Sequence, residues 1–402
     1  MRGQAPVAVA GPATRSRTFG AVLLMLCQSF QSLVFGGVGL FLPLIRKDVG
    51  LSFGEAGALS AASSAVYALM QLPSGYLSDR IGPKRLFAVG LAGTNVLAIV
   101  FASLHGFVPL LLSQTVSGFF RSLVFAPGLL LMTALFPPER RATALGLYVA
   151  GGFSSNIFLN LLGPVLVHPL GWRWLFVIFS GGGLTMLALY WRLGSAGPGP
   201  KEPVPIRQAL TLFRYRVMWV IGAIQYVRLA VVFGITFWLP SYLVDERHRS
   251  LALAGVAAAI ASAMTAPSNF LGGYVSDRLR SPLIVIGGSL AMIAVTTALL
   301  AAVHQIVLVI VIVALNALFI QLYFGPLFSI PIEMLGQRSA GLASGFGNFF
   351  ANVGGFTFVY TLGKVKDVTG SFATGFYSLS GLALLGLACA IALSRMKPLD
   401  DF

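Results

Sequence analysis

Apolar runs of about 20 residues recur along nearly the whole chain, and this feature limits its fold most strongly. A helix of that length matches the thickness of the hydrocarbon core of a bilayer. The composition agrees, because 57% of the residues are hydrophobic and only 10% are charged, against about 25% charged in a soluble protein. The chain has too few polar side chains to cover a surface in water, which excludes a soluble enzyme, a disordered chain and a disulfide-stabilised scaffold. We expect an all-α integral membrane protein with the lipid bilayer as its partner.

Twelve of these runs are candidate membrane spans. They lie at residues 18–45, 54–78, 86–104, 108–136, 142–167, 172–192, 217–244, 251–276, 283–303, 306–332, 339–363 and 371–394. The first run is too long for the core of a cleavable signal peptide, so we expect it to remain as the first span. One connecting segment, rich in Gly, Pro and charged residues, separates the first six spans from the last six. The expected organisation is a tail (1–17), a six-helix bundle (18–192), a linker (193–216), a second six-helix bundle (217–394) and a second tail (395–402).

The distribution of Lys and Arg predicts the orientation in the membrane. If the N-terminus is cytoplasmic, eighteen basic residues fall in inside segments and seven in outside segments, which is the bias that orients membrane proteins. We therefore expect both termini, the linker and the two tails to be cytoplasmic, in a multi-pass protein of the cell's inner (cytoplasmic) membrane. The net charge of +15 is mainly a topology signal, and we expect no nucleic acid partner.

The sequence contains an internal repeat. Gly75-Tyr-Leu-Ser-Asp79-Arg80 follows the second span, and Gly273-Tyr-Val-Ser-Asp277-Arg278 follows the eighth, 198 residues later. A weaker match places Arg141 before the fifth span and Arg338 before the eleventh, 197 residues apart. Two matches at nearly the same offset indicate a duplicated six-helix unit.

The segment Gly75-Tyr-Leu-Ser-Asp79-Arg80-Ile-Gly82-Pro-Lys84-Arg85 resembles the signature loop between the second and third helices of the major facilitator superfamily. The resemblance covers the whole chain and implies two pseudo-symmetric six-helix bundles that move a solute by alternating access. It also implies that the loop acts as a conformational latch, although its charges could serve orientation alone. The candidate gating residues are Asp79, Arg80, Arg141, Asp277, Arg278 and Arg338. We expect Gly75 to allow two helices to approach closely.

Two arginines, Arg121 and Arg228, fall in the middle of spans, where a charge is costly and marks a functional site by default. All twelve Asp and Glu residues fall at span ends or in loops, so neither arginine has a carboxylate partner at its depth. An anionic substrate would supply the missing charge, and a guanidinium suits a carboxylate or another oxyanion. The alternative is that an arginine binds backbone carbonyls or reaches towards water.

Neutral polar residues at similar depth complete the candidate substrate site, although each could instead form hydrogen bonds between helices. They are Gln28, Gln31, Tyr226, Asn156, Asn316, Gln321, Tyr323, Asn348 and Asn352.

Three further motifs resemble the anion:cation symporter branch of the superfamily: Thr236-Phe-Trp-Leu-Pro-Ser-Tyr-Leu, Gly171-Trp-Arg-Trp174 and Asp367-Val-Thr-Gly-Ser-Phe372. That branch often has Arg and, seven residues later, Glu in span four, where this chain has Gln114 and Arg121. The resemblance implies a small organic anion, a mono- or dicarboxylate, moved by proton symport or anion exchange. The departure at Arg121 removes the carboxylate that the branch uses for proton coupling.

The alternative function is a multidrug–proton antiporter, which would favour an acidic cavity rather than a basic one. An integral-membrane enzyme would need a cluster of His, Asp, Glu or Cys at mid-depth, and the sequence has none. We therefore expect a transporter without a cofactor or a metal site, whose partners are a small anionic substrate and protons as a coupling ion, and which acts as a monomer.

Overall fold

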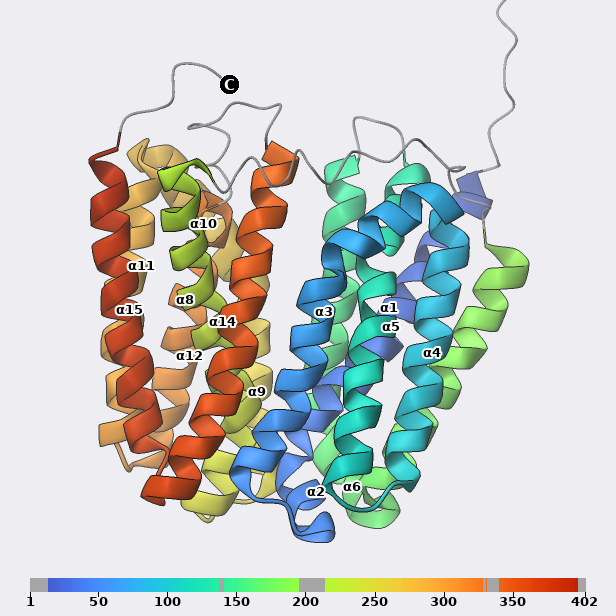
Figure 1. Cartoon of the computed structure of the whole chain (residues 1–402), viewed down its shortest axis with the longest axis horizontal. Helices are drawn as coiled ribbons and strands as arrows, with labels where there is room; N and C mark the ends of the chain where they lie inside the picture. Colours follow the sequence, from blue (N-terminus) through green and yellow to red (C-terminus); the bar gives the residue numbers. More distant parts are fainter. Residues whose placement is uncertain (1–13, 137–140, 195–213, 328–329, 331–339, 397–402) are drawn as a thin grey trace, which may run out of the picture.

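The computed structural model describes residues 14–136, 141–194, 214–327, 330 and 340–396. These residues form helices joined by short turns, and they contain no strand. Figure 1 shows the helices as two upright bundles side by side, one from each half of the sequence. The all-helical membrane fold expected from the sequence is confirmed.

The first bundle begins with a helix that breaks near its end. A break at Phe41 separates the first helix from a short second helix. Pro43 lies in the first turn of this second helix, a position that favours helix initiation. The last helix of this bundle contains a break at Gly171, whose positive φ of 76° suits glycine. Its elements are α1 (Thr14–Leu40), α2 (Leu42–Val49), α3 (Phe53–Ile81), α4 (Pro83–Ser103), α5 (Phe107–Ala134) and α6 (Arg141–Leu193).

The second bundle has two short helices in place of one long predicted span, separated at Met264. Its elements are α8 (Arg216–Ser241), the π-helical turn η3 (Tyr242–Glu246), α9 (Leu251–Ala263), α10 (Thr265–Leu279), α11 (Pro282–Ala302), α12 (Ile306–Leu322), α14 (Ala340–Thr369) and α15 (Ala373–Ser394).

Nine segments of the described chain are long and apolar enough to cross a membrane. One of them, Ser154–Leu193, contains parts of two predicted spans joined at Gly171. The helices α3 and α14 have 29 and 30 residues but carry many Gly, Ser and other small or polar residues, so they are not among the nine. The helices are therefore consistent with the twelve predicted spans.

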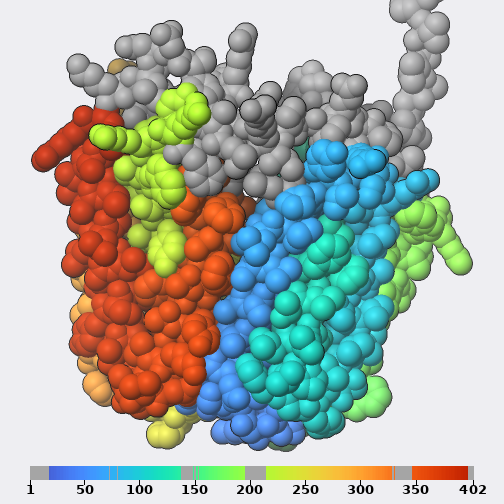
Figure 2. All heavy atoms as spheres, viewed as in Figure 1, coloured from blue at the N-terminus to red at the C-terminus, as the bar shows by residue number. Residues whose placement is uncertain are grey.

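The two bundles meet along two helix pairs. Helix α3 packs along α14, and α6 packs along α9. Figure 2 shows the atoms of α3 and α14 in contact along one face of the seam. We call the end of the molecule that contains Gly82 and Arg280 the motif end, and the end that contains α2 and η3 the sealed end (top and bottom of Figure 1).

The glycines that allow close helix contact differ from the one expected. A Cβ atom at Gly75 or at Gly273 would have nothing within 4 Å, so neither glycine permits a close approach in this conformation. The adjacent Gly272 instead faces the backbone oxygen of Leu322, and Gly118 faces that of Ser63. The prediction for Gly75 was wrong in this conformation because the contact of α3 with α5 falls on the adjacent Ser74, whose hydroxyl donates to the Ser122 carbonyl, while the Cβ position of Gly75 points away from described neighbours.

Candidate functional site

A cavity of about 310 Å³ lies between the bundles. Helices α1, α3, α5 and α6 line it from one side, and α8, α9, α10, α12 and α14 from the other. None of the residues that line it is charged. Its polar residues are Ser60, Ser63, Gln114, Asn156, Asn160, Thr236, Ser262, Thr265, Asn316 and Gln321, and the rest are apolar or glycine. The size and the mixture of apolar walls with a few polar groups are typical of small-molecule sites.

Arg121 lies beside this cavity and not on its wall. Its guanidinium carbon is 3.9 Å from the ring centre of Phe35 and 4.4 Å from that of Tyr67. The Nη1 atom is buried and has no hydrogen-bond partner among the described residues. Arg121 lines a second, smaller cavity of about 20 Å³, which we call the annex. The annex shares four lining residues with the central cavity: Phe35, Val38, Ser63 and Gln114.

Arg228 occupies the corresponding depth in the second bundle. It is buried, its Nε donates a hydrogen bond of 2.9 Å to Oε1 of Gln225, and its guanidinium carbon lies 4.7 Å from the ring centre of Phe324. The Gln225 amide, one helical turn earlier on α8, thus fixes the orientation of the guanidinium.

On its own helix, each arginine lies on the motif-end side of the residues that line the central cavity. Arg121 follows Gln114 by seven residues on α5, and Arg228 precedes Val232, the nearest lining residue of α8, by four, which correspond to about 10 and 6 Å along the helices. Among the described residues the ion pairs are Arg46–Asp245, Arg173–Asp48 and Lys366–Glu246, and neither buried arginine takes part in one.

The neutral residues predicted for the site divide into two groups. Asn156, Asn316 and Gln321 line the central cavity, although Asn316 also donates hydrogen bonds of 2.8 and 3.0 Å to Thr296 and Thr297. The others lie outside its wall and contact their own bundle or are buried within it. Gln28 accepts a hydrogen bond from Tyr148, Tyr226 packs on Phe358, and Asn352 donates to the carbonyl of Asn348. Gln31 and Tyr323 are buried, and within the described part of the chain the Nε2 atom of the first and the hydroxyl of the second have no hydrogen-bond partner.

The predicted gating residues are placed only in part. Arg80, Asp277 and Arg278 are exposed at the motif ends of α3 and α10. The side chains of Asp79 and Arg141 and the whole of Arg338 lie outside the described part of the structure. The latch at this end therefore stays a prediction.

The sealed end holds the two bundles together through polar contacts that the sequence did not predict. The Arg46 Nη1 atom of α2 donates a hydrogen bond of 3.1 Å to Oδ2 of Asp245 in η3. Burial lowers the pKa of the Arg46 guanidinium, while the nearby Asp245 and Asp367 carboxylates oppose this shift. The Asp367 carboxylate at the end of α14 accepts hydrogen bonds from the backbone N–H groups of Phe53 (2.9 Å) and Gly54 (2.6 Å).

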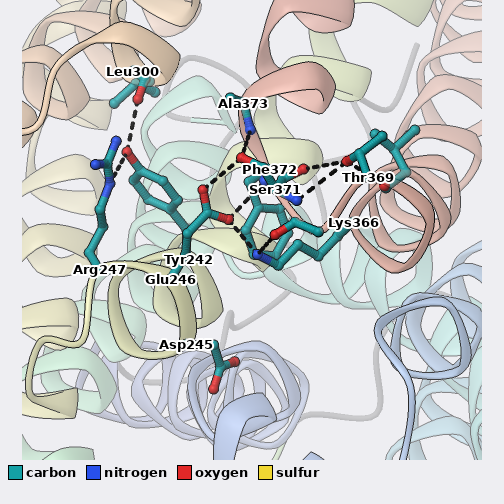
Figure 3. Close-up of polar contacts among 12 residues, drawn as sticks. Tyr242, Asp245, Glu246, Arg247, Leu300, Lys366, Thr369, Ser371, Phe372 and Ala373 are labelled. Atoms are coloured by element: carbon teal, nitrogen blue, oxygen red, sulfur yellow. Dashed lines mark hydrogen bonds and ion pairs between the residues drawn. The ribbon is translucent and has the colours of Figure 1, made fainter.

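A second network holds the parts of the second bundle around this contact (Figure 3). The Glu246 carboxylate accepts hydrogen bonds from Nζ of Lys366 (2.6 Å), from the Ser371 hydroxyl (2.9 Å) and from the Phe372 backbone N–H (2.8 Å). Nearby, Arg247 donates to the hydroxyl of Tyr242. These bonds fix η3 against the end of α14 and the turn that follows it. Asp367, which contacts the first bundle, lies in the same last turn of α14.

Phe53 of the first bundle lies among aromatic rings of the second. Its ring centre is 6.0 Å from that of Trp238 and 5.5 Å from that of Phe372. The Arg46 guanidinium carbon covers the same ring at 3.3 Å. We call Phe53, Arg46, Asp245 and Asp367 together the sealed-end lock.

The sequence profile of the Major Facilitator Superfamily matches residues 24–359, most of the chain. The chain belongs to the major facilitator superfamily. Relatives in this superfamily include the D-galactonate transporter of Escherichia coli O6:H1 (23% identical; 87% of this chain and 89% of the relative) and the probable sulfoacetate transporter SauU of Cupriavidus necator (25% identical; 96% and 94%).

A solved structure has the same major facilitator fold. It is an inward-facing, occupied crystal structure of a bacterial homologue of the human lysosomal transporter Spinster, with a TM-score of 0.84 and 17% identity over 96% of this chain and 98% of that chain. Together with the family, this fold identifies the protein as a multi-pass membrane transporter rather than an enzyme.

The sequence did not reveal the sealed-end lock or the contact of Phe35 with Arg121. Arg46, Asp245 and Asp367 were recognisable only as charges near the outer ends of spans. The sequence contains 31 Phe residues, and the pattern of apolar runs does not distinguish Phe35 or Phe53 from the others. The only signal in the sequence was the position of Phe53 and Asp367 at the ends of predicted spans.

Proposed function

We propose that this chain is a secondary transporter that moves a small organic anion, a mono- or dicarboxylate, across the cytoplasmic membrane by alternating access. The observation that carries the proposal is the pair of mid-membrane arginines, one in each bundle, without a carboxylate partner among the described residues. A buried charge without a partner costs several kcal/mol. An anionic substrate that approaches both arginines would offset this cost only while it is bound.

The surroundings of the arginines favour an organic anion. The cavity beside them is neutral, apolar over most of its wall, and supplied with hydroxyl and amide groups. Such a wall suits the uncharged body of a hydroxylated carboxylic acid, whose charged end would face the arginines. The relatives named for D-galactonate and sulfoacetate are consistent with this substrate class.

The orientation follows from the basic residues. With both termini cytoplasmic, the motif end faces the cytoplasm and the sealed end faces the outside. The sealed-end lock then closes the outer side, and the two six-helix bundles (18–192 and 217–394), joined by the 193–216 linker, rock about the cavity.

The proposed coupling is proton symport or anion exchange by a monomer. In symport the proton travels with the substrate, because neither the cavity wall nor the annex wall has a carboxylate.

The test is uptake of a panel of organic anions into proteoliposomes with and without a pH gradient. We expect Arg121→Gln and Arg228→Gln each to lower the initial rate of anion uptake about 10- to 100-fold. Arg121→Gln removes a charge-assisted hydrogen bond of about 1.5–3 kcal/mol, and Arg228→Gln removes the second buried positive charge that attracts the anion. The matched control is Arg192→Gln at the exposed end of α6, which should leave uptake unchanged.

Normal uptake by both core variants would overturn the anion site. Transport of cationic dyes with proton exchange, and of no anion, would favour the multidrug–proton antiporter instead.

A further inference from the structure

The two arginines differ in how they connect to the central cavity. Arg121 lines the annex, whose wall includes four residues of the cavity, whereas Arg228 lines neither space. Every residue around the annex belongs to the first bundle. They are Val34, Phe35, Val38, Ser63, Thr94, Ala98, Gln114, Ser117, Arg121 and Phe176.

Phe35 stands at the boundary between the two spaces. Its ring contacts the Arg121 guanidinium, and the residue lines both the annex and the cavity. The negative face of an aromatic ring attracts a cation, so the ring partly offsets the buried charge. It leaves Nη1 of Arg121 buried and unpaired among the described residues.

The annex has the dimensions and the chemistry of a site for one oxygen atom. A cavity needs about 10–15 Å³ to hold a water molecule, and the annex has about 20 Å³. The lining residues that can donate a hydrogen bond into it are Arg121, Gln114, Ser63 and Ser117, whereas the Thr94 hydroxyl already donates to the Gly90 carbonyl. A carboxylate or another oxyanion oxygen fits these donors better than a cation or an apolar group does.

We propose, resting on the anion-transport function above, that the annex is the subsite for the charged end of the substrate and that Phe35 is the side chain that opens and closes it. Arg121 receives the oxyanion from the cavity when the Phe35 ring moves aside. The carboxylate then replaces the ring as the partner of the guanidinium. Arg228, held by Gln225, contributes its charge without lining this subsite.

The backbone next to Phe35 is suited to such a movement. The sequence Phe35-Gly36-Gly37-Val38-Gly39 places three glycines within one turn of α1. Glycine lowers the stability of a helix interior by about 0.5–1 kcal/mol relative to alanine, which makes local bending of α1 easier at this point than elsewhere.

The test measures access to the annex with thiol reagents, independently of transport. Ser117, which lines the annex and not the cavity, is replaced by Cys in a full-length chain in which Cys27 and Cys389 are replaced by Ala. The purified protein is treated in detergent with an anionic reagent (sulfonatoethyl methanethiosulfonate) and a cationic one (trimethylammonioethyl methanethiosulfonate). The rate of each modification is followed by mass spectrometry.

We expect Phe35→Ala to raise the rate of anionic labelling of S117C at least about tenfold, because it joins the annex to the cavity. Adding Arg121→Gln should then remove the preference for the anionic over the cationic reagent. Phe324→Ala, which removes the ring beside Arg228, is the matched control and should leave labelling of S117C unchanged.

Equal labelling of S117C with and without Phe35→Ala overturns the role of Phe35. An anionic preference that persists in Arg121→Gln overturns the subsite. Because labelling does not depend on transport, these outcomes are separate from a failure of the uptake assay, which would contradict the proposed function alone.

Discussion

At the scale of single residues, glycines at the seam decide how closely the bundles meet, and Gly255 is one of them. A Cβ atom at Gly255 of α9 would overlap the backbone oxygen of Asn160 on α6, across the seam. Gly255→Ala must therefore push α6 and α9 apart, and overpacking of this kind costs about 1–3 kcal/mol. Because the contact joins two bundles, the cost falls on the sealed conformation. We expect anion uptake in proteoliposomes to fall about 5-fold or more, as 1 kcal/mol changes an equilibrium by a factor of about five.

The control for this substitution is Gly181→Ala on α6, where an added Cβ atom would have nothing within 4 Å. It should leave uptake unchanged and should not lower the thermal unfolding temperature, because alanine is the better residue in a helix interior. Wild-type uptake by Gly255→Ala would show that the bundles do not need this close contact.

Single residues also show what the sequence could reveal. Arg121 and Arg228 could be found because a charge within an apolar run is rare and costly. Their aromatic partners Phe35 and Phe324 could not, since ring contacts depend on the relative rotation of helices. Asp367 and Phe53 are 314 residues apart, so their hydrogen bond follows only from the packing of α3 on α14.

At the scale of elements, the start of α3 is stabilised from two sources. Within the helix, Ser52 and Glu55 form a capping box. From the other bundle, Asp367 accepts hydrogen bonds from the N–H groups of Phe53 and Gly54, which places a negative charge at the positive end of the helix dipole. The second contact exists only while the sealed end is closed, so it stabilises one conformation over another.

Asp367→Ala should therefore favour opening of the sealed end. Loss of a helix cap costs about 0.5–2 kcal/mol, which corresponds to an open population about 2- to 30-fold larger. The measurement is labelling of S60C, at the cavity wall, by a membrane-impermeant thiol reagent added to the outside of right-side-out vesicles. Glu55→Gln is the control, because it weakens the cap within α3 but no contact between bundles. Equal labelling rates in Asp367→Ala and the parent S60C protein would contradict a role for the cap in closure.

The limits of the elements were predictable where glycine or proline sets them. The break at Gly171 was expected between two spans, and its positive φ explains it. The separate helix α2 and the turn η3 were not expected, because each continues the apolar run before it and differs only in local backbone geometry. These two short elements carry Arg46 and Asp245, so the missed elements and the missed contact have the same cause.

At the scale of the whole molecule, the duplicated sequence predicts two similar halves but not their relative position. The alternate conformations of a transporter differ by only a few kcal/mol, which is too little to leave a mark in hydropathy or repeat spacing. In the structure, the sealed-end lock joins the halves at one end. Transport by alternating access requires these contacts to break once in each cycle.

A cross-link between the bundles at the cavity wall, next to the sealed end, should therefore stop transport without unfolding the protein. A Cβ atom at Gly39 of α1 would lie 3.7 Å from Cα of Phe237 on α8, within reach of a disulfide. In G39C/F237C, with Cys27 and Cys389 replaced by Ala, we expect oxidation to abolish anion uptake and a reductant to restore it. The single variants, treated alike, control for oxidation and for loss of the Phe237 ring.

Because the bond holds only the conformation closed at this end, labelling of S117C from the motif end should continue in the oxidised protein. Full uptake by the cross-linked protein would show that the sealed end does not open during transport.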